Sequence, residues 1–292
     1  MSELLYSLLN GLSMGATTFL VAAGLTLIFG ILRILNFAHG VFFAVGAYAA
    51  FVLVGGAAQS IGTYVLASAG AAILVGILGY VTDLVVLRRL RGVEGEYALI
   101  ATFALLLIGT GVIKLIWGSD PLVASPPSPL QGALKLGPAL VPYFSIFMLA
   151  TGILAFVLME WALNYSHIGK VAQAVARDPW MAGVLGINVP LVMTASVVVS
   201  FMLVGLAGGL MAANQALTPH LADGYLLLAF NAVIVGGLGS VRGAFAASFL
   251  LGVGESLLVM LLPNLPGVPI YLALIAFLLV RPQGLFPNPN AH

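Results

Sequence analysis

Apolar stretches long enough to cross a lipid bilayer follow one another along nearly the whole of this 292-residue chain. A membrane-spanning helix needs about 20 such residues, and only helices or closed barrels satisfy their backbone groups within lipid. The chain is 62% hydrophobic and 7% charged, whereas about a quarter of the residues in a soluble domain are charged. We therefore expect an all-α, polytopic membrane bundle that forms a single domain over residues 1–292.

Nine candidate spans are separated by glycine, proline or charged residues, and counts of eight and ten remain alternatives. They lie near residues 4–29, 37–56, 62–87, 97–117, 142–161, 190–213, 225–238, 243–262 and 268–280. The connection 118–141 carries five prolines. This density predicts an extended surface loop without regular helix. Such a loop either docks a partner on the outer side or simply joins two spans.

Lys and Arg are distributed unevenly between the two sets of connections. Cytoplasmic connections of membrane proteins are enriched in these residues. If Arg88, Arg89 and Arg91 are cytoplasmic, eight of the ten basic residues share that side, and only Lys114 and Lys135 lie outside. The asymmetry predicts an outer N-terminus, a cytoplasmic C-terminus and a cytoplasmic position for the polar segment 164–190. Three tryptophans are then expected at span ends: Trp117, Trp161 and Trp180.

The segment 164–190 is the longest polar insertion and is predicted to form two short helices with a break between them. The first has an apolar stripe and an opposite polar side. The stripe consists of Ile168, Val171, Ala172 and Val175, and the polar side of Lys170, Gln173 and Arg177. Asp178 is placed as N-cap of the second helix, Pro179 at its first position and Gly186 just past its end. A folded platform outside the bilayer favours contact with a soluble partner; the alternative is a helix that lies on lipid.

Two apolar segments, 41–54 and 225–235, are shorter than a full crossing and end at glycine pairs. Discontinuous helices at matching places in two halves of a chain are typical of a transport path. The candidates for lining such a path are Asn36, His39, Asn231, Gly236, Gly237 and Gly239. A structural cap on a helix that starts at Phe37, with His39 in its first turn, is the favoured interpretation of Asn36 over a substrate or gating contact.

Glu255 is interpreted as the only carboxylate placed well inside the apolar layer. An ionisable group there suggests a function. A proton relay would need a second carboxylate or a facing cation, and neither is expected nearby. A protonated side chain, or one that extends to the interface, is therefore at least as good an interpretation.

The motifs of catalysis are missing from the sequence. Gly169-Lys170 is followed by Val171, so no phosphate-binding P-loop is formed, and neither a Gly-x-Ser-x-Gly elbow nor a His-Glu-x-x-His helix occurs. The four histidines are scattered and there are no cysteines, so we expect no metal site and no cofactor. The net charge of +1 predicts no nucleic-acid partner.

Four strings resemble the LivH-type permeases of branched-chain amino acid ABC importers, and the similarity covers essentially the whole chain. They are residues 24–40 with Gly46-Ala-Tyr48, the Ala176-Arg-Asp-Pro loop ending in Gly186-Ile-Asn188, Gly236-Gly-Leu-Gly-Ser240 with Gly243-Ala244, and Arg281-Pro-Gln-Gly-Leu-Phe286. The Asn-Phe-Ala-His-Gly and Arg-Pro-Gln-Gly-Leu-Phe strings are the most specific of these.

The resemblance implies a multi-pass subunit of the bacterial inner membrane. It would pair with a homologous LivM-type permease above two ABC ATPase subunits, and a periplasmic substrate-binding protein would deliver the solute. By resemblance, the loop couples to an ATPase through Lys170, Arg177, Asp178, Pro179, Trp180 and Gly186. The family also includes permeases assigned to urea, amides and other small carboxylates. A stand-alone secondary transporter or channel for a small polar solute remains the alternative, and a membrane-embedded enzyme would need clustered titratable groups.

Overall fold

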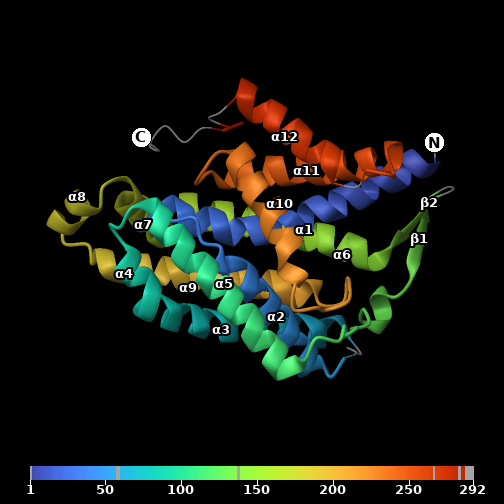
Figure 1. The fold of residues 1–292 in the computed structure, drawn as a ribbon, viewed down its shortest axis with the longest axis horizontal. Coiled ribbons are helices and arrows are strands. Elements are labelled where there is room, and N and C mark those ends of the chain that lie inside the picture. Colours follow the sequence, from blue (N-terminus) through green and yellow to red (C-terminus); the bar gives the residue numbers. More distant parts are fainter. Residues whose placement is uncertain (1, 57–59, 137–138, 266, 282–283, 287–292) are drawn as a thin grey trace.

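The computed structural model describes residues 2–56, 60–136, 139–265, 267–281 and 284–286, and shows a helical bundle with one small hairpin (Figure 1). Each expected span coincides with a helix. These helices are α1 (Ser2–Leu32), α2 (Ala38–Val54), α3 (Ile61–Thr82), α5 (Gly95–Trp117), α6 (Tyr143–Asn164), α9 (Val189–Met211), α10 (Leu221–Gly236), α11 (Val241–Leu261) and α12 (Val268–Val280). Six helices in the described part of the chain are long and apolar enough to cross a membrane, whereas α2, α10 and α12 are shorter. The predicted polytopic all-α bundle is confirmed.

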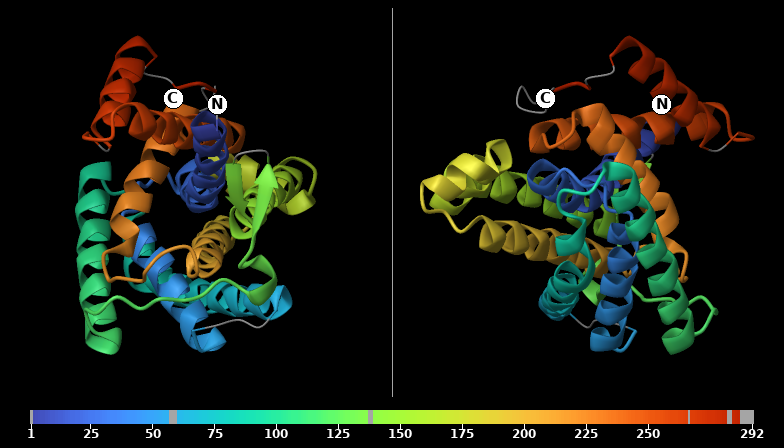
Figure 2. Two further views of the ribbon diagram at one scale, coloured as in Figure 1. Left: turned by 90° about the vertical axis from the view of Figure 1, so that its right-hand side faces the viewer. Right: turned by 60° about the vertical axis from the view of Figure 1, so that its left-hand side comes forward.

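Helix α1 lies at the centre of the bundle. In α1, 78% of an apolar 18-residue stretch is buried, against 17% of the corresponding stretch in α5 and in α6. Helices α5 and α6 lie on opposite flanks of the bundle (Figure 2). The closest partner of α1 is α11, because Gly11 and Gly15 of α1 meet Gly252 of α11 without intervening side chains. Small residues allow such backbone contact between helices in lipid. The peripheral helices direct their apolar side chains outward, as a lipid environment requires.

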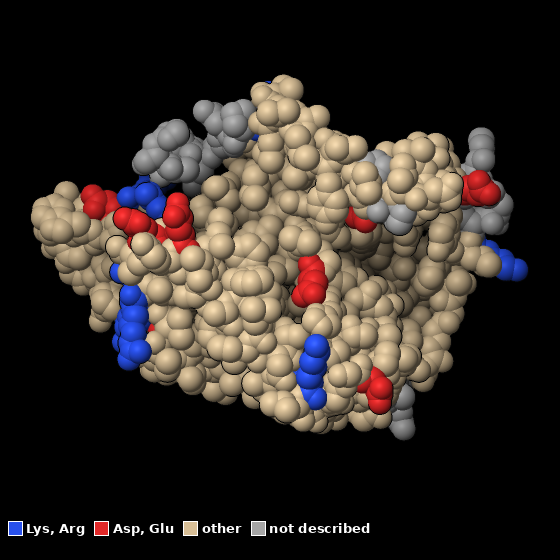
Figure 3. All heavy atoms as spheres, viewed as in Figure 1, with Lys and Arg blue, Asp and Glu red and all other residues tan. Residues whose placement is uncertain are grey.

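The two ends of the bundle differ in structure. One end carries the antiparallel strands β1 (Ala133–Leu136) and β2 (Ala139–Pro142), and the other carries the helices α7 (His167–Arg177) and α8 (Pro179–Val184) (Figure 1). Charged side chains on the face drawn in Figure 3 gather toward the α7–α8 end. The uneven distribution of Lys and Arg between the two sets of connections therefore corresponds to two structurally distinct ends of the molecule.

The proline-rich connection is more ordered than a purely extended loop. It contains a 3-10 turn, Ser128–Leu130, and leads into the β1–β2 hairpin. Leu122 also forms a β-bridge with Leu217, in the connection between α9 and α10. The prediction that this segment lacks α-helix is confirmed, whereas the expectation of an extended loop throughout was wrong. Backbone pairing satisfies groups that the prolines leave outside helices.

Candidate functional site: the platform and the interrupted helices

The platform consists of α7 and α8 and has the predicted helix–break–helix structure. The Ser166 hydroxyl accepts a hydrogen bond from the Gly169 amide at 3.0 Å and caps α7. Asp178 Oδ1 accepts from the Met181 amide at 2.9 Å, so Asp178 caps α8 and Pro179 occupies its first turn. Gly186 follows α8 with a φ of 85°. The predicted local structure of the break is confirmed.

The face by which α7 packs on the bundle begins one turn later than the sequence pattern predicts. Ala172 and Val175 are buried, but Ile168 is 82% exposed, so its place in the packed stripe was wrong. Gln173, expected on the polar side, instead donates to the Leu163 carbonyl at 2.8 Å. It thereby satisfies an acceptor at the end of α6, where helix carbonyls lack intrahelical partners.

Helix α8 exposes an apolar surface that faces away from the bundle. Trp180 is 73% exposed and Leu185 74%, and Met181 and Val184 are exposed beside them. Trp180 therefore lies on the platform and not at the end of a span. Lys170 and Arg177 are exposed on the neighbouring helix. An apolar patch rimmed by charges is typical of a contact surface.

One pocket lies between the platform and the connections that flank the two interrupted helices. It has a volume of about 560 Å³ and is walled by α7, by the ends of α1 and α6, and by the start of α11. The connection between α1 and α2 contributes Arg33, and the connection between α10 and α11 contributes Gly239. The last turn of α1 meets the connection between α10 and α11, because a Cβ on Gly30 would lie 3.5 Å from the Gly239 Cα.

The elbow between α1 and α2 is held by two side chains. Asn36 is fully buried, and its Oδ1 accepts from the Ala38 amide at 3.1 Å. From α5, the Thr102 hydroxyl accepts from the Phe37 amide at 3.2 Å, and its proton is shared between the Leu99 carbonyl of α5 at 3.1 Å and the Leu35 carbonyl at 3.3 Å. Helix α2 starts at Ala38, one residue later than expected. Protein groups therefore satisfy the backbone that the interruption leaves open, as required at membrane depth.

His39 is wholly buried between α1 and α9. Its Nε2 occupies the space that a side chain on Gly24 would fill, since a Cβ there would lie 2.6 Å away. The Ser200 hydroxyl donates to the Gly24 carbonyl at 2.6 Å beside it. In this conformation His39 is part of the contact between three helices, and Asn36 lies just before the N-cap residue Phe37, where it holds the turn into α2.

The elbow between α10 and α11 is closed by the C-terminal segment. Gly237 turns the chain with a φ of 103°. The amides of Leu285 and Phe286 donate to the carbonyls of Val235 and Gly236 at 2.7 and 3.1 Å. Gly236 and Gly237 are buried, whereas Asn231 and Gly239 are half-buried. Two strings that are distant in the sequence, Gly236–Ser240 and the terminal string, thus meet here; Pro282 and Gln283 lie outside the described residues.

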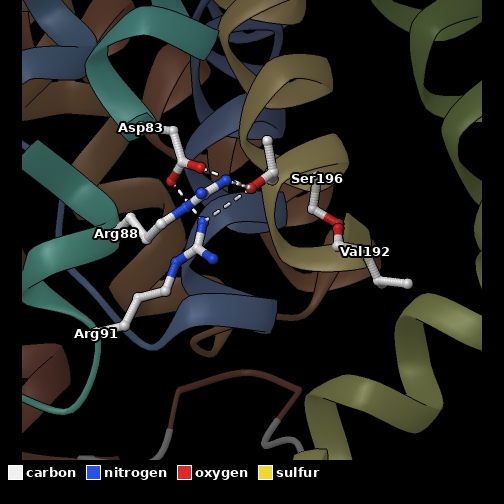
Figure 4. Close-up of polar contacts among 6 residues, drawn as sticks. Asp83, Arg88, Arg91, Val192 and Ser196 are labelled. Carbon is white, nitrogen blue, oxygen red and sulfur yellow. Dashed lines mark hydrogen bonds and ion pairs between the residues drawn. The ribbon is translucent and has the colours of Figure 1, made fainter. Parts of the chain in front are cut away.

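A buried ionic cluster, which the sequence pattern did not reveal, lies where α3 ends (Figure 4). Asp83 is fully buried in the π-turn Asp83–Leu87, and Arg91 Nη2 contacts its Oδ1 at 2.5 Å. The Thr194 hydroxyl of α9 donates to Asp83 Oδ2 at 2.7 Å, and Arg88 donates to Thr194 at 3.2 Å. The interpretation of Glu255 as the only carboxylate within the apolar layer was therefore wrong. The signal available was an Asp inside a predicted span with arginines five and eight residues later.

Glu255 lies near the opposite end of the bundle and is half-buried. It borders a pocket of about 730 Å³ between α1 and α11, together with Glu3, Asn10 and Ser256. The expectation that no second carboxylate lies nearby was wrong, because Glu3 lines the same pocket.

Comparison with known proteins places these features in a family. A profile described as "Branched-chain amino acid transport system / permease component" matches residues 7–280. The chain belongs to this permease family. It is 28% identical to the high-affinity branched-chain amino acid transport system permease protein LivH of Escherichia coli K12, over 99% of this chain and 97% of the relative.

Two further relatives are similar over most of their length. The permease protein BraD of Pseudomonas aeruginosa is 29% identical over 99% of this chain and 97% of its own. A probable LivH of Methanocaldococcus jannaschii is 30% identical over 91% of this chain and 87% of its own. No solved structure matches the chain. The sequence segments that resemble the permease family lie in the elbows and in the platform of this chain.

Proposed function

We propose that this chain is the permease subunit of an ABC importer for branched-chain or other small amino acids. It forms half of a translocation path that opens alternately outward and inward. A LivM-type permease supplies the other half, two ABC ATPase subunits supply the energy, and a periplasmic binding protein delivers the solute. The chain acts as one permease domain in a bacterial inner membrane, with its N-terminus periplasmic and its C-terminus cytoplasmic.

The observation that carries the proposal is the shared pocket. Helix α7 forms one of its walls, and the elbows that end α1 and α10 form another. A displacement of the platform would therefore act on the connections that lead into α2 and out of α10. Packed helices of this kind move as rigid bodies between a few arrangements.

The chemistry of the platform surface supports an ATPase as its partner. The exposed apolar side chains of α8 and of Leu185, which follows it, suit a groove in a soluble subunit; Trp180 is the largest of them. Asp178 caps α8, so the break between α7 and α8 keeps a defined conformation when a partner displaces the platform. A helix that only lies on the lipid surface would not be stabilised there by a second capped helix start at Asp178-Pro179.

The path itself is proposed to lie along the interrupted helices, with Asn36, His39, Asn231 and the glycines Gly236, Gly237 and Gly239 as candidate lining groups. Because Asn36 and His39 are buried in the conformation described, they would contact solute only after the elbows move. In this scheme we assign the chain no catalytic role, and ATP hydrolysis belongs to the partners.

The test is to reconstitute the assembly in vesicles with Arg177 and Asp178 both replaced by Ala. Substrate-stimulated ATP hydrolysis and ATP-driven uptake are expected to fall together. Lys135→Ala, at the opposite end of the bundle, serves as the control and should leave both unchanged. Unaltered hydrolysis and uptake in the platform variant would count against coupling, and uptake without any ATPase subunit would favour a stand-alone transporter.

A further inference from the structure

We propose that residues 284–286, here called the C-terminal latch, form a releasable closure of the elbow between α10 and α11. The latch holds this elbow in the conformation described, and the elbow changes conformation only when the latch is released. The inference rests on the proposed function, in which a partner displaces the platform. It adds to that function the part of the chain that must open in response.

The latch satisfies backbone groups that α10 leaves open at its end. The amides of Leu285 and Phe286 donate to the carbonyls of Val235 and Gly236 at 2.7 and 3.1 Å. These carbonyls belong to the last turn of α10, where helix carbonyls lack intrahelical partners. A carbonyl that loses its donor away from water is unfavourable. The latch can therefore be released only when water reaches the elbow, which gives a closed, dry arrangement and an open, hydrated one.

The fit between the latch and the elbow is made mainly by backbone. Gly284 has a φ of 80°, and a Cβ there would lie 2.8 Å from the Gly237 amide nitrogen and 2.9 Å from the Val235 carbonyl oxygen. Leu285 is only partly buried against the core, and the Phe286 side chain is 50% exposed. Stabilisation by burial scales with the apolar area removed from water. Hydrogen bonds, more than a packed core, thus hold the latch closed, as suits a contact that opens and closes.

The helix that leads into the latch does not anchor it. Helix α12 lies at the edge of the bundle (Figure 1), and its last residues, Leu279 and Val280, are both 81% exposed. The Gly284 amide donates to the Arg281 carbonyl at 3.1 Å, so the latch turns directly after the helix end. Its release therefore requires no separation of a buried interface at these last residues of α12. Segments with few buried apolar contacts are the ones that open locally at low free energy.

The latch lies beside the platform. Phe286 lines the pocket of about 560 Å³ together with Ala172 and Ala176 of α7 and Gly239 of the elbow. Helix α7 and the latch therefore border the same space, and a displacement of α7 alters the surroundings of the latch directly. Because Gly239 meets Gly30 of α1, an elbow freed from the latch also changes its contact with the central helix of the bundle.

The first measurement is hydrogen exchange of the wild-type assembly, read by mass spectrometry of the peptides that contain the Leu285 and Phe286 amides. The assembly is compared without nucleotide and with a non-hydrolysable ATP analogue. The exchange rates of these two amides should differ about tenfold between the two conditions, as for an opening that breaks two hydrogen bonds. Amides in the buried part of α1 should exchange equally in both. Equal exchange of the latch amides would overturn the proposal.

The second measurement compares Phe286→Pro, which removes an amide donor, with Phe286→Ala, which keeps it, in vesicles that contain the whole assembly. Uptake per ATP hydrolysed should fall several-fold in Phe286→Pro, because the elbow then opens without the platform, and should stay near the wild-type value in Phe286→Ala. Equal behaviour of the two variants would overturn the role of the amide. Uptake by the wild type without ATPase subunits would refute the proposed function itself, whereas ATP-driven uptake with unchanged latch exchange would refute the latch alone.

Discussion

Thr194 donates a 2.7 Å hydrogen bond to the buried carboxylate of Asp83 and so joins the start of α9 to the π-turn at the end of α3. Helix α9 begins five residues after α8 ends. The Thr194–Asp83 hydrogen bond therefore connects the helix that follows the platform to the first half of the bundle. Single π-turns inside helices are often found at functional positions.

We expect Asp83→Ala to destabilise the protein by about 3 kcal/mol or more, because it leaves Arg91 without its buried partner. Thr194→Val should cost less, since it removes a neutral hydroxyl that donates to Asp83 and accepts from Arg88 but leaves the Asp83–Arg91 ion pair in place. Thermal unfolding in detergent measures both. Thr82→Val is the matched control, because that hydroxyl bonds only to the Leu78 carbonyl of its own helix. An Asp83→Ala variant as stable as the wild type would show that the cluster is not holding α3 to α9.

Thr102→Val tests the elbow between α1 and α2. It leaves the Phe37 amide and the Leu35 carbonyl without their shared partner, which should cost about 1–3 kcal/mol. Thr110→Val in the same helix serves as the control, because its hydroxyl donates to the Leu106 carbonyl one turn earlier. We expect lower thermal stability and reduced uptake only for Thr102→Val. Equal behaviour of the two variants would contradict a holding role for Thr102.

Gly284→Ala tests the closure of the elbow between α10 and α11. Gly284 has a φ of 80°, and a Cβ there would lie 2.8 Å from the Gly237 amide nitrogen. The terminal segment should therefore detach, and exchange of the Leu285 and Phe286 amides, which donate to the Val235 and Gly236 carbonyls, should become faster. Hydrogen exchange measured by mass spectrometry reports this directly. Gly111→Ala, where no atom lies within 4 Å of the added carbon, should leave the exchange unchanged.

The sequence was most informative where structure depends on neighbouring residues. The Asp178-Pro179 restart and the short segments follow from capping and chain length, which are local properties. The Asp83 cluster was missed because its partners lie eight residues away across a π-turn and more than a hundred residues away in α9. Ile168 was misplaced because periodicity shows which residues share a face, but not where a neighbouring helix ends. The contact between Gly30 at the end of α1 and Gly239 in the connection between α10 and α11 likewise depends on tertiary packing.

Glu255→Gln is expected to leave uptake and its pH dependence unchanged. Glu255 borders a pocket near the end that carries β1 and β2, away from the platform, so a proton taken up there has no described route through the bundle. Uptake by reconstituted vesicles is measured across a range of pH. A shifted pH profile would instead assign proton coupling to Glu255 together with Glu3.

Photo-cross-linking from α8 tests the coupling role of the platform. A photoreactive amino acid replaces Leu185, which is 74% exposed on the platform, and in a second variant replaces Leu115, which is 87% exposed on α5. After illumination of membranes that contain the whole assembly, position 185 should form an adduct with an ATP-hydrolysing subunit, and position 115 should not. Adducts of position 185 with phospholipid alone would contradict the coupling role.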